Sequence, residues 1–206
     1  MSSRELILAR VRRNQPPWRE LPTIPEFARA PGDLLAAFAA ALARMGGRMA
    51  EAPTGESLYA CIRSLHPQAR VICSAAPEVD GTRAISSIAS PAELDDVDVG
   101  VVRAVFGVAE TGSVWLSERE FVVNALGFLP QHLVVLLDPK AIVANLHDAY
   151  RDRGFFEARY AVFMTGPSAT ADIEGVLIRG AQGIRTLTVI PVAPAANGAV
   201  NERRTP

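Results

Sequence analysis

The sequence predicts an α/β protein built around a largely parallel sheet, with helices covering both faces. Short continuous apolar runs, typical of buried strands, alternate along the chain with stretches whose apolar residues recur every three or four positions, as in amphipathic helices. Apolar residues make up 49% of the 206 residues, which is enough for one substantial core. We therefore expect a single domain, preceded by an arm and followed by a short tail.

The arm is expected over residues 1–31. Apolar residues at helical spacing predict a short amphipathic helix over 2–14. Prolines then exclude regular helix over 16–31 and favour an extended strap. The strap contains four large apolar side chains: Trp18, Leu21, Ile24 and Phe27. Such side chains need a covering surface, which could be the chain's own domain or another subunit.

The predicted domain covers residues 32–193 and begins with two helices. Asp33 is placed to cap a helix over 34–45, because its side chain can accept hydrogen bonds from the first free amides, and two glycines end this helix. A second helix is expected over about 55–65, with His66 and a proline after it. The run RVICSA, residues 70–75, predicts a buried strand.

Strands predominate from residue 98 onward. Two β-rich pieces are expected within residues 98–118, around a glycine-bearing centre, and HLVVLL predicts a further strand. The next predicted elements are a helix over 139–151, a strand at YAVFMTG, a short helix at ADIEGVLIRG and a strand at TLTVIPV. The tail, residues 194–206, lacks large apolar side chains and is expected to be disordered.

Composition excludes several classes of function. The formal net charge of −1 removes a general attraction to nucleic acid or to anionic membranes. The two cysteines have no metal-ligand spacing and the three histidines lie far apart, so we expect this chain to bind no metal or other cofactor. No signal peptide and no apolar run of about 18 residues is evident, which predicts a cytoplasmic protein without a membrane span.

Two segments leave a predicted strand with small and polar residues, where ligands bind in open parallel sheets. The first is FGVAETGS, residues 106–113. Its glycines, Gly107 and Gly112, would let backbone approach a ligand closely. Glu110, beside Thr111 in an apolar setting, would suit acid–base or nucleophilic chemistry if it were desolvated. The alternative is a turn acid that is hydrogen-bonded to backbone amides.

The second segment is TGPSATADIE, residues 165–174. A turn, a hydroxyl cap and an acid in the first helical turn explain part of it as an ordinary helix start. The remaining polar groups and the free helix amides could instead hold a small anionic ligand. With Glu110 as the candidate catalytic residue, the predicted ligand-binding residues are Gly107, Thr111, Gly112, Ser113, Thr165, Gly166, Ser168, Thr170, Asp172 and Glu174.

These motifs resemble those of a known family. GVAETGSVWL, LPQHLVVLL and TGPSATADIEGVLIRGAQG resemble the lactate utilisation protein C family, also called the LUD domain family, and SRELILARVRRN is similar to the start of its members. The resemblance implies a fold similar to ribose-5-phosphate isomerase, glucosamine-6-phosphate deaminase and CoA transferases. It also implies a role in bacterial oxidation of L-lactate to pyruvate beside two partner subunits, at least one of them with iron–sulfur clusters.

One position departs from the family pattern. Where the pattern runs Gly-x-His-Gly-Pro, this chain has GAQGI, with Gln182 and Ile184 in place of the His and the Pro. A glutamine can still form hydrogen bonds but cannot titrate near neutral pH. Gln182 therefore joins the predicted ligand-binding residues, and binding is favoured over proton transfer.

Three functions stay open on the sequence. The favoured one is a non-redox, ligand-binding or accessory subunit of a lactate-oxidising system, with an iron–sulfur partner subunit, a small anionic ligand and self-association as further expectations. The second is a stand-alone enzyme acting on a small phosphorylated or CoA-linked substrate, with Glu110 as base or nucleophile. The third is a structural or regulatory module, in which the polar residues of the loops serve only to form turns.

Overall fold

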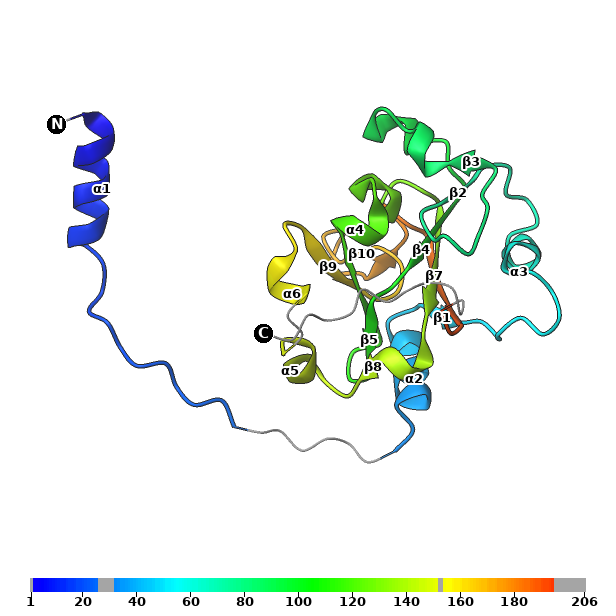
Figure 1. Cartoon of the computed structure of the whole chain (residues 1–206), viewed down its shortest axis with the longest axis horizontal. Coiled ribbons are helices and arrows are strands. Elements are labelled where there is room, and N and C mark those ends of the chain that lie inside the picture. Colours follow the sequence, from blue (N-terminus) through cyan, green and yellow to red (C-terminus); the bar gives the residue numbers. More distant parts are fainter. Residues whose placement is uncertain (1, 26–31, 152–153, 195–206) are drawn as a thin grey trace.

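The structure is a computed structural model that describes residues 2–25, 32–151 and 154–194. Its centre is a six-stranded sheet in the order β1-β12-β7-β4-β2-β3, in which all neighbouring strands are parallel (Figure 1). The strands are β1 (Arg48–Met49), β2 (Ile72–Ser74), β3 (Arg83–Ala84), β4 (Val99–Arg103), β7 (His132–Leu137) and β12 (Thr186–Pro191). The predicted α/β class with a largely parallel sheet is confirmed.

The two faces of this sheet pack against different layers. On one face, Cys61 and Ile62 of helix α3 (Leu58–Leu65) join a core cluster with Val101 and Leu136. On the other face, helix α2 (Leu34–Arg44) contributes Phe38 to a second, larger cluster. The predicted helices over 34–45 and about 55–65 are therefore confirmed, and each covers one face.

A second sheet lies on the same face as α2, and the sequence did not predict it as a separate sheet. Its strands are β8 (Ile142–Val143), β5 (Phe106–Val108), β6 (Ser113–Ser117) and β9 (Ala161–Met164), in that order. The β5–β6 and β6–β9 pairs are antiparallel. Gly112 has a φ of 66°, in the left-handed region, so the chain after β5 turns tightly and β6 returns beside it.

The predicted helix over 139–151 is wrong. Residues 139–141 form a single 3₁₀ turn, β8 follows, and only α5 (Leu146–Ala149) is α-helical. Ile142 and Val143 pair with Gly107 and Val108 of β5, so cross-strand pairing of two β-branched residues outweighs the helical spacing of their neighbours. The other short helices are α4 (Glu118–Phe121) and α6 (Gly154–Glu157).

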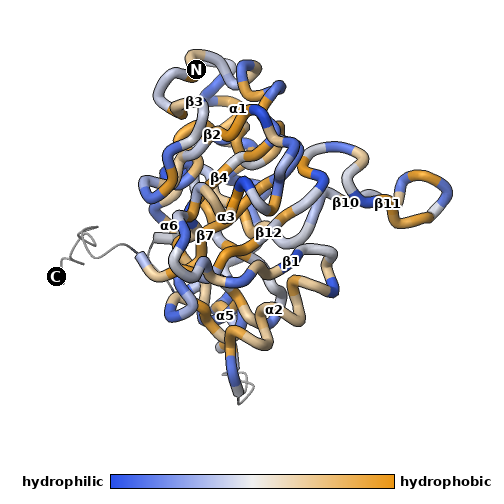
Figure 2. The backbone as a smooth tube through the Cα atoms, turned by 90° about the vertical axis from the view of Figure 1, so that its right-hand side faces the viewer, coloured by the Kyte–Doolittle hydropathy of each residue, from blue (hydrophilic) through white to orange (hydrophobic). Residues whose placement is uncertain are grey.

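The predicted helix at ADIEGVLIRG is also wrong. β10 (Ala169–Thr170) and β11 (Ile178–Arg179) form an antiparallel hairpin that stands out from the body (Figure 2). Asp172 donates its amide hydrogen to the Thr170 hydroxyl oxygen, and Glu174 and Gly175 have φ values of 54° and 71°, which reverse the chain. No helix begins here, so the free helix amides expected to hold an anion are absent.

The N-terminal arm begins with the predicted helix, α1 (Ser3–Arg13), which is capped by Ser2. No residue of α1 is buried, and the strap stays exposed as far as Pro25, with Trp18 86% exposed. The described part of the strap therefore does not pack on its own domain. Phe27, the rest of the strap to residue 31 and the predicted tail beyond Pro194 lie outside the described residues.

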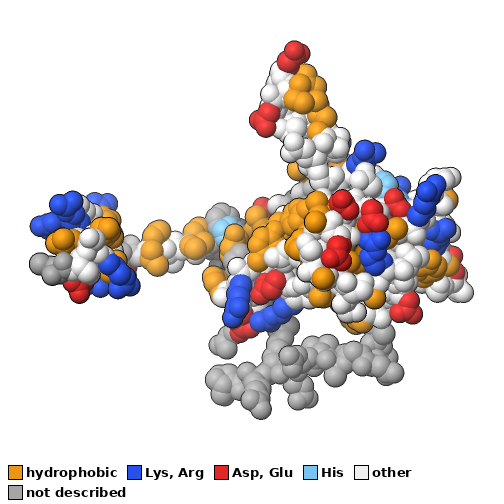
Figure 3. Space-filling view, turned by 90° about the horizontal axis from the view of Figure 1, so that it is seen from above, with side chains coloured by type: hydrophobic (Ala, Val, Ile, Leu, Met, Phe, Trp, Pro, Cys, Tyr) orange, Lys and Arg blue, Asp and Glu red, His pale blue; other side chains and the backbone are white. Residues whose placement is uncertain are grey.

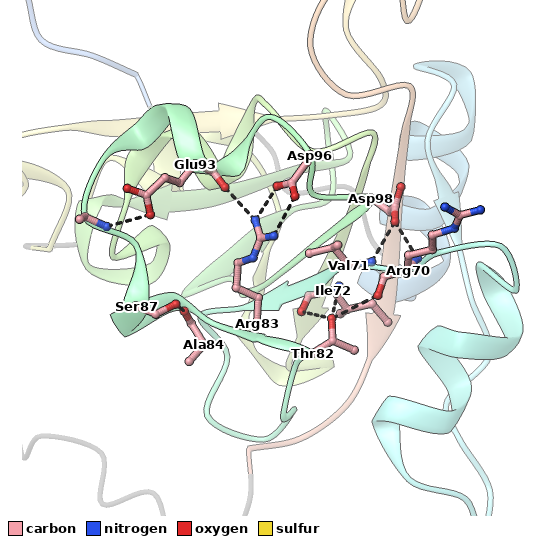
Figure 4. A network of polar contacts seen from close by, with 11 residues as sticks. Arg70, Val71, Ile72, Thr82, Arg83, Ala84, Ser87, Glu93, Asp96 and Asp98 are labelled. Atoms are coloured by element: carbon pink, nitrogen blue, oxygen red, sulfur yellow. Dashed lines mark hydrogen bonds and ion pairs between the residues drawn. The ribbon is translucent and has the colours of Figure 1, made fainter.

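Polar contacts fix the position of the segment between β2 and β4, residues 75–98 (Figure 4). Arg83 forms an ion pair with Asp96, with 2.8 Å between Nη2 and Oδ2, and also donates to the backbone oxygen of Glu93. Asp98 accepts hydrogen bonds from the amides of Arg70 and Val71, which fixes the start of β2 beside β4. Within the described ranges, the structure has no helix long and apolar enough to cross a membrane.

Candidate functional site

Both predicted site loops pack against helix α2 or the turn that follows it. A Cβ atom on Gly112 would lie 2.2 Å from the backbone nitrogen of Leu42. A Cβ atom on Gly166 would lie 2.2 Å from the backbone oxygen of Met45. Both glycines have a positive φ, 66° and 65°. Each loop therefore needs glycine because its backbone contacts the backbone of α2 or of the turn that follows it.

This packing changes the interpretation of the glycines in the first loop. The sequence suggested that Gly107 and Gly112 admit a ligand, but what approaches them is protein. A Cβ atom on Gly107 would lie 3.0 Å from Leu137 of β7 and from Phe38 of α2. Ser113, also a predicted ligand-binding residue, is 5% exposed at the start of β6. Gly107 and Gly112 are thus packed against protein, and Ser113 is buried beside them.

The two loops meet at their threonines. Thr165 donates its hydroxyl hydrogen to the backbone oxygen of Thr111, at an oxygen–oxygen distance of 3.4 Å. The contact follows from the second sheet, because Val114 of β6 pairs with Met164 at the end of β9. The hydroxyl oxygen of Thr111 is itself buried and has no hydrogen-bond partner among the described residues.

A cleft of about 450 Å³ lies between α2 and the first loop. Its lining residues are Gly32, Asp33, Leu34, Ala37, Ala40, Arg44, Ala109, Glu110, Ala144 and Asn145. The cleft is large enough for a small metabolite, and its walls are mainly apolar with a few converging polar groups, which is typical of ligand sites. None of the residues 165–174 lines it, so this cleft does not join the two predicted site segments.

Glu110 in this cleft is tied to the backbone. Its carboxylate accepts a hydrogen bond from the amide of Leu146 at 3.1 Å, at the start of α5, and its own amide donates to the oxygen of Ala144. The residue is exposed to solvent. The geometry matches the turn-acid alternative, and the desolvation that acid–base chemistry at Glu110 would need is absent from this structure.

The polar residues that accompany Glu110 were not predicted as site residues. Arg44 brings a positive charge from the last turn of α2, and Asn145 adds a side-chain amide whose oxygen already caps α5 at 2.9 Å from the amide of Asp148. A cation, an amide donor and a carboxylate suit a small ligand with a carboxylate or several hydroxyls. Arg44 is the only charged residue of α2, which is the sequence signal that could have identified it.

The other predicted ligand-binding residues lie in or beside the β10–β11 hairpin. Ser168 is half-buried. Its amide donates a hydrogen bond to the backbone oxygen of Ile184, and its backbone oxygen accepts one from the amide of Gly180, so it links the hairpin to the following loop. Thr170 is bonded to Asp172. Asp172, Glu174 and Gln182 are exposed. The structure thus gathers these residues in a projecting hairpin, separate from the Glu110 cleft.

Another pocket, of about 260 Å³, lies at the amino ends of β4 and β7. His66 and His132 stack there with 4.5 Å between ring centroids, beside Asp98. Burial, the His132 ring and Arg48 lower the pKa of His66 to about 4. Burial, Arg185 and Arg48 also lower the pKa of His132. Both rings are therefore neutral at physiological pH.

The described residues contain no group of three or more His, Cys, Asp or Glu side chains arranged to hold a metal ion. Cys61 and Cys73 are both buried free cysteines. Burial raises the pKa of each thiol, so both are protonated at neutral pH.

Comparison with known proteins adds a family and a fold. A family model described as "LUD domain" matches residues 91–192, from before β4 to the end of β12. The chain is 31% identical to lactate utilization protein C of Deinococcus radiodurans over 106 residues, which are 50% of each chain. It is 28% identical to an uncharacterized protein of Neisseria meningitidis serogroup B over 102 residues, which are 48% of this chain and 44% of that protein. The alignments thus span about half the length of these curated relatives.

A solved structure supports the fold. The crystal structure of a DUF162 family protein from Deinococcus radiodurans superposes with a TM-score of 0.62. The superposition covers 78% of this chain and 96% of that one, at 20% sequence identity.

Proposed function

Since the chain belongs to the LUD domain family, we propose that it is a non-redox, ligand-binding subunit of a bacterial lactate-utilisation system. The observation that carries the proposal is the 31% identity with lactate utilization protein C. In the proposal, electron transfer belongs to an iron–sulfur partner subunit, because the whole chain has only two cysteines and both are buried. This chain contributes a small-molecule site.

We place that site in the cleft between α2 and the first loop. Arg44 would pair with a carboxylate of the ligand, and Glu110 and Asn145 would accept and donate hydrogen bonds to its hydroxyl or carbonyl groups. Binding fits this geometry better than proton transfer does, because Glu110 is exposed and already holds the amide of Leu146. The stand-alone enzyme with Glu110 as base or nucleophile is therefore the weaker hypothesis.

A genetic experiment tests the role. Deletion of the gene should abolish or slow growth on L-lactate, and the wild-type gene should restore it. Arg44→Gln should fail to restore growth although the protein folds. Arg70→Gln, which changes an exposed arginine outside the cleft, is the matched control and should restore growth. Normal growth of the deletion strain on L-lactate would contradict the proposal.

A binding experiment tests the site. L-Lactate and pyruvate are the two probes, because the proposed system consumes one and forms the other. A ligand that binds the native state must raise the melting temperature by mass action. We expect a rise for the wild type, a smaller rise for Glu110→Gln and none for Arg44→Gln. If neither probe shifts the wild type, the ligand-binding part of the proposal fails.

A further inference from the structure

The N-terminal arm and the β10–β11 hairpin both expose large apolar side chains away from the body. Figure 3 shows the arm at the left and the hairpin at the top, projecting in different directions. On α1, the most exposed are Ile7 at 61% and Val11 at 53%. At the end of the hairpin, Ile173, Val176 and Leu177 are 53%, 59% and 59% exposed. Neither set is covered within the described part of the chain.

Neither element is expected to be stable without a partner surface. An isolated helix of 11 residues is marginal in water, since nucleation is unfavourable and α1 buries no residue against the body. The hairpin has only two cross-strand pairs, Ala169 with Arg179 and Thr170 with Ile178. A two-stranded hairpin is likewise marginal when it stands alone. Both elements therefore gain most from a contact that covers their apolar side chains.

The two surfaces have complementary charges. The helix of the arm carries Arg4, Arg10, Arg12 and Arg13 against one acid, Glu5, which gives a net charge of +3. The end of the hairpin carries Asp172 and Glu174, both exposed. Figure 3 shows acidic and apolar side chains together on the projecting hairpin. Arg179 of β11 is also exposed, at the base of the hairpin, so the acidic character is confined to its end. A basic helix with an apolar face thus matches a hairpin end that is both acidic and apolar.

We propose that the arm of one copy of this chain docks on the β10–β11 hairpin of a second copy. Both halves of the contact lie on one polypeptide, so a second copy supplies what each half needs without any other protein. Each copy docks its arm on the hairpin of the other copy and receives the other arm on its own hairpin. These two identical contacts close a two-fold dimer. Residues 14–32 can span roughly 60 Å when extended, which gives the arm a long reach.

This dimer explains two features that the candidate site does not use. The strap carries Trp18 at 86% and Leu21 at 87% exposure. In the dimer the partner copy covers these two side chains. The acids of the hairpin end, which the sequence suggested as ligand-binding residues, then act as docking residues for arginines.

Oligomeric state and Trp18 fluorescence test the proposal in the full chain. Light scattering after gel filtration should give twice the chain mass of 22.0 kDa, with dissociation on dilution. The chain has two tryptophans, and Trp115 is 4% exposed, so a change in emission on dilution reports Trp18. Emission should shift to longer wavelength as the dimer dissociates. A wild-type protein that stays a monomer at every concentration overturns the proposal, including when it binds a partner subunit or anionic vesicles.

Charge reversal tests the pairing itself. Arg10→Glu with Arg13→Glu in the arm should raise the dimer dissociation constant tenfold or more, and so should Asp172→Arg with Glu174→Arg in the hairpin. The four changes combined should restore dimerisation, which a merely unfolded variant could not do. Asp80→Arg with Glu56→Arg reverses two exposed acids elsewhere and should have no effect. A dimer that persists in both reversed variants, or no recovery in the combined one, overturns the arm–hairpin contact.

Discussion

Thr165 donates a hydrogen bond to the backbone oxygen of Thr111 across 54 residues of sequence, and this contact joins the turn after β5 to the turn after β9. Both turns rest on α2 or on the turn that follows it, through Gly112 and Gly166. The helix therefore sets the position of both loops. One of them lines the candidate cleft, and the other leads into the projecting hairpin.

Gly112→Ala should destabilise the protein strongly. The new Cβ would lie 2.2 Å from the nitrogen of Leu42, and the residue would also hold a left-handed φ of 66°. We expect a loss of about 2–5 kcal/mol from backbone strain and overpacking together, measured by urea unfolding. Gly175→Ala is the control, since Gly175 has a φ of 71° but no atom within 4 Å of the new Cβ. Equal losses at both glycines would show that contact with α2 does not matter.

Glu110→Ala should destabilise the protein slightly, and Glu110→Gln less. The alanine variant leaves the amide of Leu146 without its side-chain acceptor, which we expect to lower the unfolding free energy by about 0.5–1 kcal/mol. Glutamine keeps an oxygen that can accept the same hydrogen bond. Thermal unfolding of the two variants beside wild type measures the difference. An alanine variant as stable as wild type would mean that Glu110 does not hold the start of α5.

The stability of the protein should fall with acid between about pH 6.5 and about pH 4. Above this window His66 is neutral in both the folded and the unfolded chain. Within this window, His66 takes up a proton in the unfolded chain. In the folded chain His66 stays neutral, because its pKa is lowered to about 4. Protonation therefore favours the unfolded state, by up to about 3 kcal/mol at the acid end.

His66→Phe tests this origin of the acid sensitivity. Phenylalanine can stack on His132 but does not titrate, and the groups around the ring, His132, Arg48, Arg185 and Asp98, stay in place. Urea unfolding at several pH values should show a flatter decline for the variant than for wild type. Parallel curves for the two proteins would assign the acid sensitivity to other groups.

Removing one partner of the Arg103–Glu78 ion pair should destabilise the protein more than removing both. Arg103 Nε and Glu78 Oε1 are 2.5 Å apart, and the two side chains are only 18% and 14% exposed. Arg103→Met leaves an unpaired, largely buried carboxylate, for which we expect a loss of about 3–5 kcal/mol. Arg103→Met with Glu78→Gln should recover part of that loss in urea unfolding. Additive losses would contradict coupling between the two residues.

Much of the fold could be predicted from the sequence because its signals are local. Asp33 caps α2 through the amides of Leu35 and Ala36, as expected of an Asp before an apolar helix. The run HLVVLL forms β7, since a continuous apolar run suits a strand buried on both faces. Errors arose where pairing between distant segments decided the structure. Ile142 and Val143 pair with β5, 35 residues earlier, and no local pattern shows this.

The candidate site was predicted in part, for the same reason. The loop with Glu110 was recognised from its small and polar residues, and it does line the largest cleft described above. Arg44 and Asn145 were missed because they belong to a helix and to a later turn that only the fold brings beside Glu110. The hairpin residues were predicted as a helix start because Thr170 and Asp172 suit a cap and a turn equally well.

By itself, the sequence determined the α/β class, the main strands, the capped helices and the family to which the chain is similar. These depend on the order of apolar and polar residues and on motifs read along the chain. The tertiary structure alone decided which residues share a cleft, that the glycines of both loops contact protein, and that the hairpin end and the described residues of the arm, 2–25, are left uncovered in a single copy. Such relationships depend on contacts between residues far apart in sequence, which exist only once the sheets and α2 have packed.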